Sequence, residues 1–499
     1  MNSFKFIAAA VSLICCLAMS AAVQRDDSPK NEMEQGWEAL WTGNLSEALR
    51  ISRLVLKGDR SKPEALRLFG LVLLHYGEPE NAVKPLRNVA LQRGECGDYR
   101  LLAVACDMAG MHEEANRVRL SAESSGNIKA PDLYALAWQK PGVDGRISLL
   151  KRIVEQFPSS CKGVPEEIAY WEQRRGRTLR RMDGRIPENG VTLKLRTLFN
   201  REWVVSREGS GEEIWLMVDT ACRTTVLPRE TAKKIGLSWI QASHPVAGAY
   251  PQEPAPEYGL LEKLDMGGLR FSDVPVIVVG DVVSNLKRRS GKLRHVYRHV
   301  ADKTTARVVY KGILGMDLLR GMKIRFDRQE NELRLFPEGA DDATLLDGDP
   351  STWTPIPAFS IHDQVFMHSS LGLQPRVLAL VSSASEVDFA SEVSLAGTGI
   401  VPNSKYRVDL NYIMGWFNEC LPLAGEVKTV PETTDIGVGR SLNKAFMLPV
   451  YPEPIGSDVR AGLCIGKSLS DLFAVALDLD GGKIYLRQVH FEKGEAGRE

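Results

Sequence analysis

The chain contains two copies of one strand pattern, and this internal repeat constrains its fold more than any other feature of the 499 residues. In the first copy the apolar run 214–218 ends at Asp219. In the second copy, about 160 residues later, the apolar run 377–381 ends at Ser382, which stands where the aspartate would recur. An apolar strand followed by small residues, present twice, predicts two structurally equivalent β lobes.

The downstream parts of the two copies agree more closely. An offset of 151 residues carries positions 313–315 to 464–466, so that Gly315 corresponds to Gly466. The same offset carries Asp327 to Asp478, Leu333 to Ile484 and Leu335 to Leu486. Coincidences at one register, each in an apolar strand beside a turn, support the two-lobe prediction.

Between about residues 188 and 490 the chain resembles the aspartic proteases of the retropepsin and pepsin type. That family has an apolar strand leading into Asp-Thr-Gly, where this chain has Asp219-Thr220-Ala221. It also has a later Gly-Ile-Leu-Gly-x-Asp stretch, which is present here as residues 312–317. Residues 266–269 and 274–276 look like the central hairpin and strand of the first lobe.

The resemblance implies which residues form the site. In the family two aspartates face each other across a twofold axis and share a proton, and together they activate a water for attack on a peptide bond. The threonine braces the loop, and the glycine lets the backbone approach closely. The implied catalytic residues here are Asp219 and Thr220. The implied cleft-supporting residues are Ala221, Gly312, Gly315, Ser382, Ser383 and Gly466.

Because Ser382 replaces the second aspartate, two functions remain open. The chain is either a peptide hydrolase that uses Asp219, with its partner acid supplied by a second chain or another residue, or an inactive peptide-binding or protein-binding module. Glu386 and Asp388 lie just beyond Ser382 but at spacings that suit a loop better than the site. In either case the ligand predicted for the interlobe cleft is a polypeptide, bound by strand addition in the second reading.

Residues 32–158 have a different pattern, which is helical. Gly43, Gly77 and Gly110 recur at spacings of 34 and 33 residues, and the same spacings separate Ala48, Ala82 and Ala115. These periods are similar to those of tetratricopeptide repeats, whose arrays offer a concave surface to a protein partner or act as rigid spacers. Both roles stay open at this point.

Two basic segments are predicted to be solvated. Residues 159–188 contain five closely spaced arginines and are interpreted as a linker or an exposed helix. Residues 286–307 interrupt the first lobe, and within them His295 and His299 have a spacing that suits one helix face. No thiol lies nearby, and a solvated loop is favoured over a metal site.

The N-terminus predicts export. Lys5 precedes an apolar run that ends in small residues near Ala22, as in a secretory signal peptide, and no other segment is long and apolar enough to span a bilayer. Basic and acidic residues balance at 63 each, which gives no global field for nucleic acid. The cysteines outside the signal lack metal spacing, and Cys222 is expected to be a small buried residue. No cofactor is predicted.

The predicted architecture is a multidomain α + β protein of the cell envelope, secreted or periplasmic. Its parts are a signal peptide (1–22), a tetratricopeptide-like helical array (32–158), a basic linker (159–188), a retropepsin-like first lobe (189–340) and a degenerate second lobe (352–490). The two lobes together are expected to form an all-β, acid-protease-like domain.

Overall fold

The computed structural model covers the chain, and the described residues are 31–41, 44–198, 201–243, 257–279, 312–327, 330–361, 363–371, 374–383, 389–391, 434–438, 441–445, 450–451, 463–466, 469–470 and 473–489. Several predictions fall outside these ranges. They concern the signal segment 1–22, the basic segment 286–307 with His295 and His299, the turn residue Gly43, and the two acids Glu386 and Asp388.

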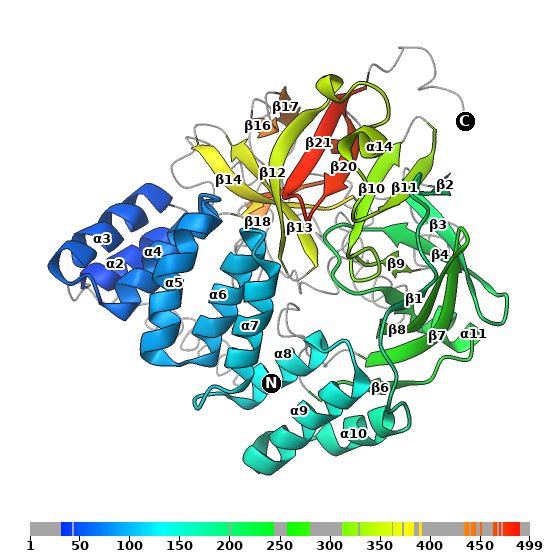
Figure 1. Ribbon diagram of the computed structural model, residues 1–499, viewed down its shortest axis with the longest axis horizontal. Helices are drawn as coiled ribbons and strands as arrows, with labels where there is room; N and C mark the ends of the chain where they lie inside the picture. The colour runs from blue at the N-terminus through cyan, green and yellow to red at the C-terminus, as the bar shows by residue number, and fades with distance from the viewer. Residues whose placement is uncertain are drawn as a thin grey trace, which may run out of the picture.

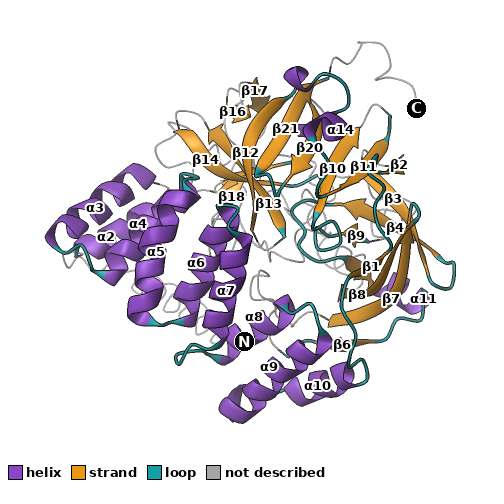
Figure 2. Cartoon of the chain, in the orientation of Figure 1, coloured by secondary structure: helices purple, strands orange, loops and turns teal. Residues whose placement is uncertain are grey.

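The N-terminal part of the chain is an array of helices that lies to one side of the β domain (Figures 1 and 2). Its helices are α2 (Glu32–Trp41), α3 (Leu45–Gly58), α4 (Pro63–His75), α5 (Pro79–Arg93), α6 (Cys96–Met108), α7 (His112–Glu123), α8 (Ala130–Gln139) and α9 (Val143–Gln156). Within the described ranges, no helix has both the length and the apolar character needed to cross a membrane.

The residues that recur in the sequence occupy equivalent places in successive helix pairs. Ala48, Ala82 and Ala115 lie in α3, α5 and α7, and each is 0% exposed. Gly77 and Gly110 follow α4 and α6 with φ values of 68° and 71°, a backbone conformation that favours glycine. The small side chains allow close helix packing and the glycines allow the tight turn, so the predicted helical repeat array is confirmed.

The rest of the chain forms two β lobes and a sheet between them. Lobe 1 contains β2 (Val191–Leu198), β3 (Arg201–Glu208), β4 (Glu213–Val218), β5 (Val226–Pro228), α11 (Arg229–Lys234), β6 (Trp239–Gln241), β7 (Glu257–Met266), β8 (Leu269–Val279), β9 (Ile313–Leu314), β10 (Met322–Asp327) and β11 (Glu332–Pro337). The segment that follows contains α14 (Asp342–Leu346) and the 3-10 helix η3 (Pro350–Thr352).

Lobe 2 contains β12 (Thr354–Ile361), β13 (Gln364–Leu371), β14 (Gln374–Val381), β15 (Phe389–Ser391), β16 (Thr434–Val438), β17 (Ser441–Ala445), β18 (Val450–Tyr451), β19 (Leu463–Ile465), β20 (Phe473–Asp478) and β21 (Lys483–Gln488). Its pairings repeat those of lobe 1. Parallel pairs β4–β9 and β5–β8 in lobe 1 have the counterparts β14–β19 and β15–β18 in lobe 2. The two parallel pairings of lobe 1 therefore recur among the described strands of lobe 2.

A six-stranded antiparallel sheet joins the lobes, with the strand order β2-β11-β10-β20-β21-β12. At its centre Arg325 of β10 lies opposite Ala476 of β20. These two positions differ by 151 residues, the offset seen in the sequence. A local twofold relation therefore passes through the middle of this sheet and exchanges the two lobes.

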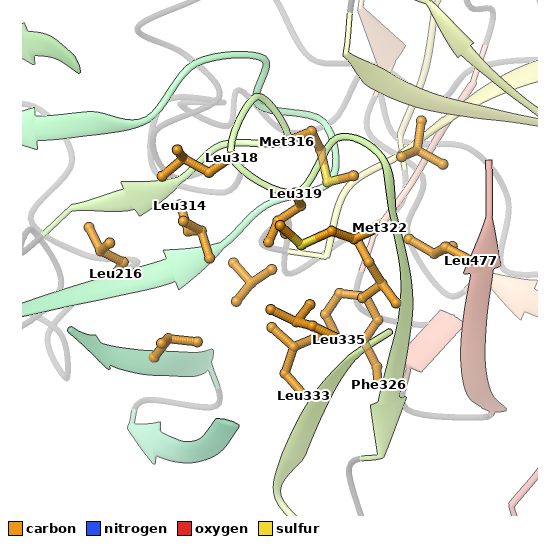
Figure 3. Close-up of a cluster of buried hydrophobic side chains, with 14 of the residues drawn as sticks. Leu216, Leu314, Met316, Leu318, Leu319, Met322, Phe326, Leu333, Leu335 and Leu477 are labelled. Atoms are coloured by element: carbon orange, nitrogen blue, oxygen red, sulfur yellow. The ribbon is translucent and has the colours of Figure 1, made fainter. Parts of the chain in front are cut away.

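One continuous hydrophobic core runs from lobe 1 through the central sheet into lobe 2. Figure 3 shows part of it, with Leu314, Met316 and Met322 of lobe 1 and Leu477 of β20 in one cluster. Alternate residues of β10, Ile324 and Phe326, belong to this core. A shared core of this kind holds the two lobes together and so fixes the place where their strand ends meet.

Residues 159–188 form a packed junction that contains a helix, where the sequence predicted a linker or an exposed helix. They include α10 (Val164–Glu172) and β1 (Arg181–Asp183), and β1 pairs with β8 of lobe 1. Trp171 is 0% exposed and stacks on Tyr258 of β7, with ring centroids 5.7 Å apart. The many arginines give the segment a polar composition. Its position is nevertheless set by the apolar face of α10, which packs against lobe 1.

Candidate functional site

The site lies where β4 of lobe 1 and β14 of lobe 2 end. Strand β4 is buried along its last three residues, and Asp219 follows it directly. The backbone N–H of Asp219 donates to the carbonyl of Leu314 in β9, at 3.3 Å. In lobe 2 the N–H of Ser382 donates to the carbonyl of Ile465 in β19, at 2.9 Å. Asp219 and Ser382 therefore occupy equivalent positions in the two lobes.

The loops that follow these residues brace each other across the twofold axis. The Thr220 hydroxyl donates to the Val381 carbonyl at 2.7 Å. The Ser383 hydroxyl donates in turn to the Val218 carbonyl at 2.8 Å. The backbone N–H of each of these two residues also donates to the hydroxyl of the other, at 3.2 Å. Ser383 thus makes the same contacts as Thr220, and the four bonds form a reciprocal lock between the lobes.

Inside this lock a single carboxylate faces a hydroxyl. The Ser382 hydroxyl donates to Oδ1 of Asp219 at 2.9 Å, and the N–H of Ala221 donates to the same oxygen at 3.0 Å. Asp219 and Ser382 are both 0% exposed. A serine hydroxyl cannot share a proton between two carboxylates as an aspartate pair does, so among the described residues the site carries one acid where paired-acid chemistry needs two.

The glycines predicted to support the site allow close backbone approach in lobe 1. A Cβ added at Gly312 would lie 2.9 Å from Leu216 and 3.0 Å from the Val226 carbonyl oxygen. At Gly315 it would lie 2.4 Å from the backbone carbon of Thr224. Gly466 follows β19 at the equivalent place in lobe 2 and is buried.

Ala221 stands where the family motif has glycine, and the structure accommodates its methyl group. The residue is 1% exposed, and its side chain belongs to an apolar cluster formed by lobe 2 and the helical array. Its carbonyl accepts from Nε2 of Gln364 at 2.7 Å. Cys222 is also buried, and its thiol donates to the Thr224 carbonyl at 3.1 Å. The expectation that Cys222 is a small buried residue agrees with this packing.

Asp317 closes the Gly-Ile-Leu-Gly-x-Asp stretch and ties it to the rest of lobe 1. Its Oδ1 accepts from the N–H and hydroxyl of Thr225 at 3.1 and 3.2 Å, and its Oδ2 accepts from Nε of Arg180 at 2.9 Å. Burial raises the pKa of this carboxyl, and the charge of Arg180 opposes the rise. The sequence predicted the motif but not Arg180, which comes from the junction segment.

A second buried polar cluster joins the junction to lobe 1. Both oxygens of the Glu167 carboxylate in α10 accept from the Tyr134 hydroxyl, at 2.9 and 3.0 Å, and one accepts from the Tyr258 hydroxyl at 2.8 Å. The N–H of Ser243, just after β6, also donates to Glu167. Burial, followed by the nearby carboxylate, raises the pKa of both tyrosines, so they remain donors. Sequence reasoning missed this cluster.

Residues 205–318, most of lobe 1, match a family model described as aspartyl protease. No curated protein matches the chain. Among solved structures the chain is similar to the aspartic proteinase from Irpex lacteus, with 12% identity, coverage of 61% of this chain and 99% of that one, and a TM-score of 0.34.

The chain is also similar to an O-GlcNAc transferase mutant from Thermobaculum terrenum, with 19% identity, 25% of each chain covered and a TM-score of 0.22. With a MamA protein the identity is 19%, the coverage is 29% of this chain and 87% of that one, and the TM-score is 0.22. Likenesses with such low TM-scores carry no conclusion about function. The match to residues 205–318 shows that the β domain is aspartyl-protease-like. The matched residues end before Ser382.

Proposed function

We propose that the chain is an exported, protease-like binding module that holds an extended polypeptide between its lobes without cutting it. The observation that carries this proposal is the hydrogen bond from Ser382 to Asp219, which puts a hydroxyl in the position of the second acid. Lobe 2 is then a degenerate copy that supplies one side of the cleft and no catalytic acid. It is the fused partner that lobe 1 needs to complete the domain.

The reciprocal bonds of Thr220 and Ser383 support a fused partner over a dimer of two first lobes. A second chain could bring its own Asp219 to the axis only by displacing lobe 2, which is tethered and bound through both hydroxyls. Export is proposed from the apolar run that ends near Ala22.

A second candidate function is peptide hydrolysis with Asp219 as the catalytic acid. The match of residues 205–318 to an aspartyl protease model favours it, as does the intact Asp219-Thr220 pair. This function needs a second acid at the site, and the position in lobe 2 that is equivalent to Asp219 is occupied by Ser382. We therefore rank it second.

Binding is tested with an unfolded polypeptide as the probe. Fluorescein-labelled casein is titrated with the purified full chain, and fluorescence anisotropy reports the complex. We expect saturable binding in the micromolar range, about 10⁻⁶ M, as is common for extended peptides bound by strand addition. The Asp219→Asn variant keeps the carbonyl oxygen that accepts from Ser382 and should bind equally well. If neither protein binds the probe, the proposal of a polypeptide-binding cleft is wrong.

A further inference from the structure

The helical array packs against one face of the lobe 2 sheet. A single buried apolar cluster contains side chains of α4, α5 and α6 together with side chains of β12, β13, β14 and β19. The lobe 2 members are Phe359, Ile361, Phe366, Leu378, Leu380 and Cys464. None of these six side chains is more than 6% exposed. The burial of the contact is therefore like that of a hydrophobic core.

The strand register identifies this face. Phe366 pairs with Leu380, and the next residues along the strands, Met367 and Ala379, pair with each other and belong to the lobe core instead. The array thus covers the side of the sheet that points away from the core. The pair Phe366–Leu380 of lobe 2 corresponds to the pair Trp203–Met217 of lobe 1. Leu380 lies two residues before Ser382, just as Met217 lies two residues before Asp219.

The same face of lobe 1 is packed differently. Trp203 and Met217 form a small cluster with Ile313, Cys222, Val226 and Ile277, and among the described residues this cluster contains lobe 1 side chains alone. The array therefore breaks the symmetry between two faces that are otherwise counterparts. Each face includes residues of the strand that leads into the site, β4 before Asp219 and β14 before Ser382.

The contact with the array also reaches the site itself. Ala221 belongs to the cluster that joins the array to lobe 2, and its N–H donates to the Asp219 carboxylate. A second close approach lies at the turn after α4, where a Cβ added to Gly77 would lie 1.5 Å from Nε2 of His368 in β13. A glycine is needed here both for its φ of 68° and for this approach.

We propose that the array is an autoinhibitory cover, which occupies the lobe 2 side of the cleft and must move before a polypeptide can contact both lobes. This inference rests on the proposed binding function. Helices α4–α6 stay attached when they move, because the last helices of the array are anchored separately on lobe 1. Helices α8, α9 and α10 are held there through the cluster of Tyr134, Glu167 and Tyr258. Ligand affinity should then depend on how firmly α4–α6 dock.

The test uses a pair of matched glycine variants. Gly77→Leu inserts a side chain into the His368 contact, whereas Gly110→Leu imposes the same backbone strain at the next repeat, where an added Cβ has no neighbour within 4 Å. Hydrogen exchange of the α4–α6 amides reports docking, and labelled casein reports affinity. We expect Gly77→Leu to expose these amides and to bind casein about tenfold more tightly than the wild type, and Gly110→Leu to do neither.

A second variant separates undocking from misfolding. In Gly77→Leu/His368→Ala the leucine fills the space that the imidazole leaves, so docking and wild-type affinity should return. If Gly77→Leu undocks the array and its affinity equals that of the wild type, the autoinhibitory role is wrong and the binding function stands. If the array of Gly77→Leu stays docked, the inference that the Gly77–His368 contact holds the cover in place is wrong. If neither protein binds casein, the binding function fails as well.

Discussion

Replacing Ser382 by aspartate is expected to destabilise the protein by about 3 kcal/mol near pH 7, and by much less near pH 4. The new carboxylate would lie within hydrogen-bond distance of Asp219, in a site where both residues are 0% exposed. Two carboxylates so close in a buried site cannot both ionise. Near pH 7 the folded protein would therefore hold a proton that the unfolded chain releases.

The sign of the pH dependence follows from this difference in bound protons. Because the folded state binds the extra proton more strongly, stability falls as the pH rises from about 4 towards 7. Ser382→Asn is the matched control, since asparagine has the size of aspartate without its charge. Thermal unfolding of both variants at the two pH values measures the effect. If both variants show the same loss at both pH values, residue 382 does not face Asp219.

Replacing Glu167 by alanine is expected to cost about 4 kcal/mol, because it leaves two buried hydroxyls and one half-buried backbone N–H without this acceptor. These donors are the hydroxyls of Tyr134 and Tyr258, both 0% exposed, and the N–H of Ser243. The variant also removes a negative charge near the guanidinium of Arg146, which is 1% exposed and lies over the rings of Trp138 and Trp171.

The control for this experiment is Glu166→Ala on the same helix, where the side chain is exposed and the expected change is within about 0.5 kcal/mol. Chemical denaturation followed by tryptophan fluorescence suits the measurement, because Trp138 and Trp171 lie in the affected cluster. Glu167→Gln keeps one acceptor and should lose about half as much stability. Equal stability of the Glu167→Ala and Glu166→Ala variants would show that the junction does not depend on this carboxylate.

The internal repeat allowed much of the β domain to be predicted from the sequence. The 151-residue offset between equivalent residues is the same offset that separates Arg325 and Ala476, which lie opposite each other in the central sheet. The recurring glycines and alanines likewise predicted the helical array, because only small residues fit tight turns and close helix contacts.

The packing of the junction could not be predicted, because its charge concealed the periodicity of its apolar residues. Val164, Glu167, Tyr170 and Trp171 recur at helical spacing and are buried on one face of α10, but the arginines that follow suggested a solvated linker. Burial of Glu167 depends on donors supplied by Tyr134 and Tyr258, which are distant in the sequence. No local pattern could have indicated that this acid is satisfied in the interior.

The docking of the array on lobe 2 could not be predicted either. It depends on the fit between two surfaces, and one of its close approaches joins Gly77 to His368, which are far apart along the chain. Helical periodicity shows that an apolar face exists but not what covers it. The role of Ser383 is an intermediate case, since the repeat placed it opposite Thr220 and the structure added its reciprocal bonds.

Cleavage of an unfolded polypeptide tests the central claim most directly, which is that a site with one carboxylate and Ser382 binds without cutting. The purified chain and its Asp219→Asn variant are incubated with labelled casein between about pH 3 and pH 7, and the products are separated by size. We predict that neither protein generates fragments above the background at any pH. Fragments produced by the wild type and lost in Asp219→Asn would contradict the claim and show that Asp219 takes part in cleavage.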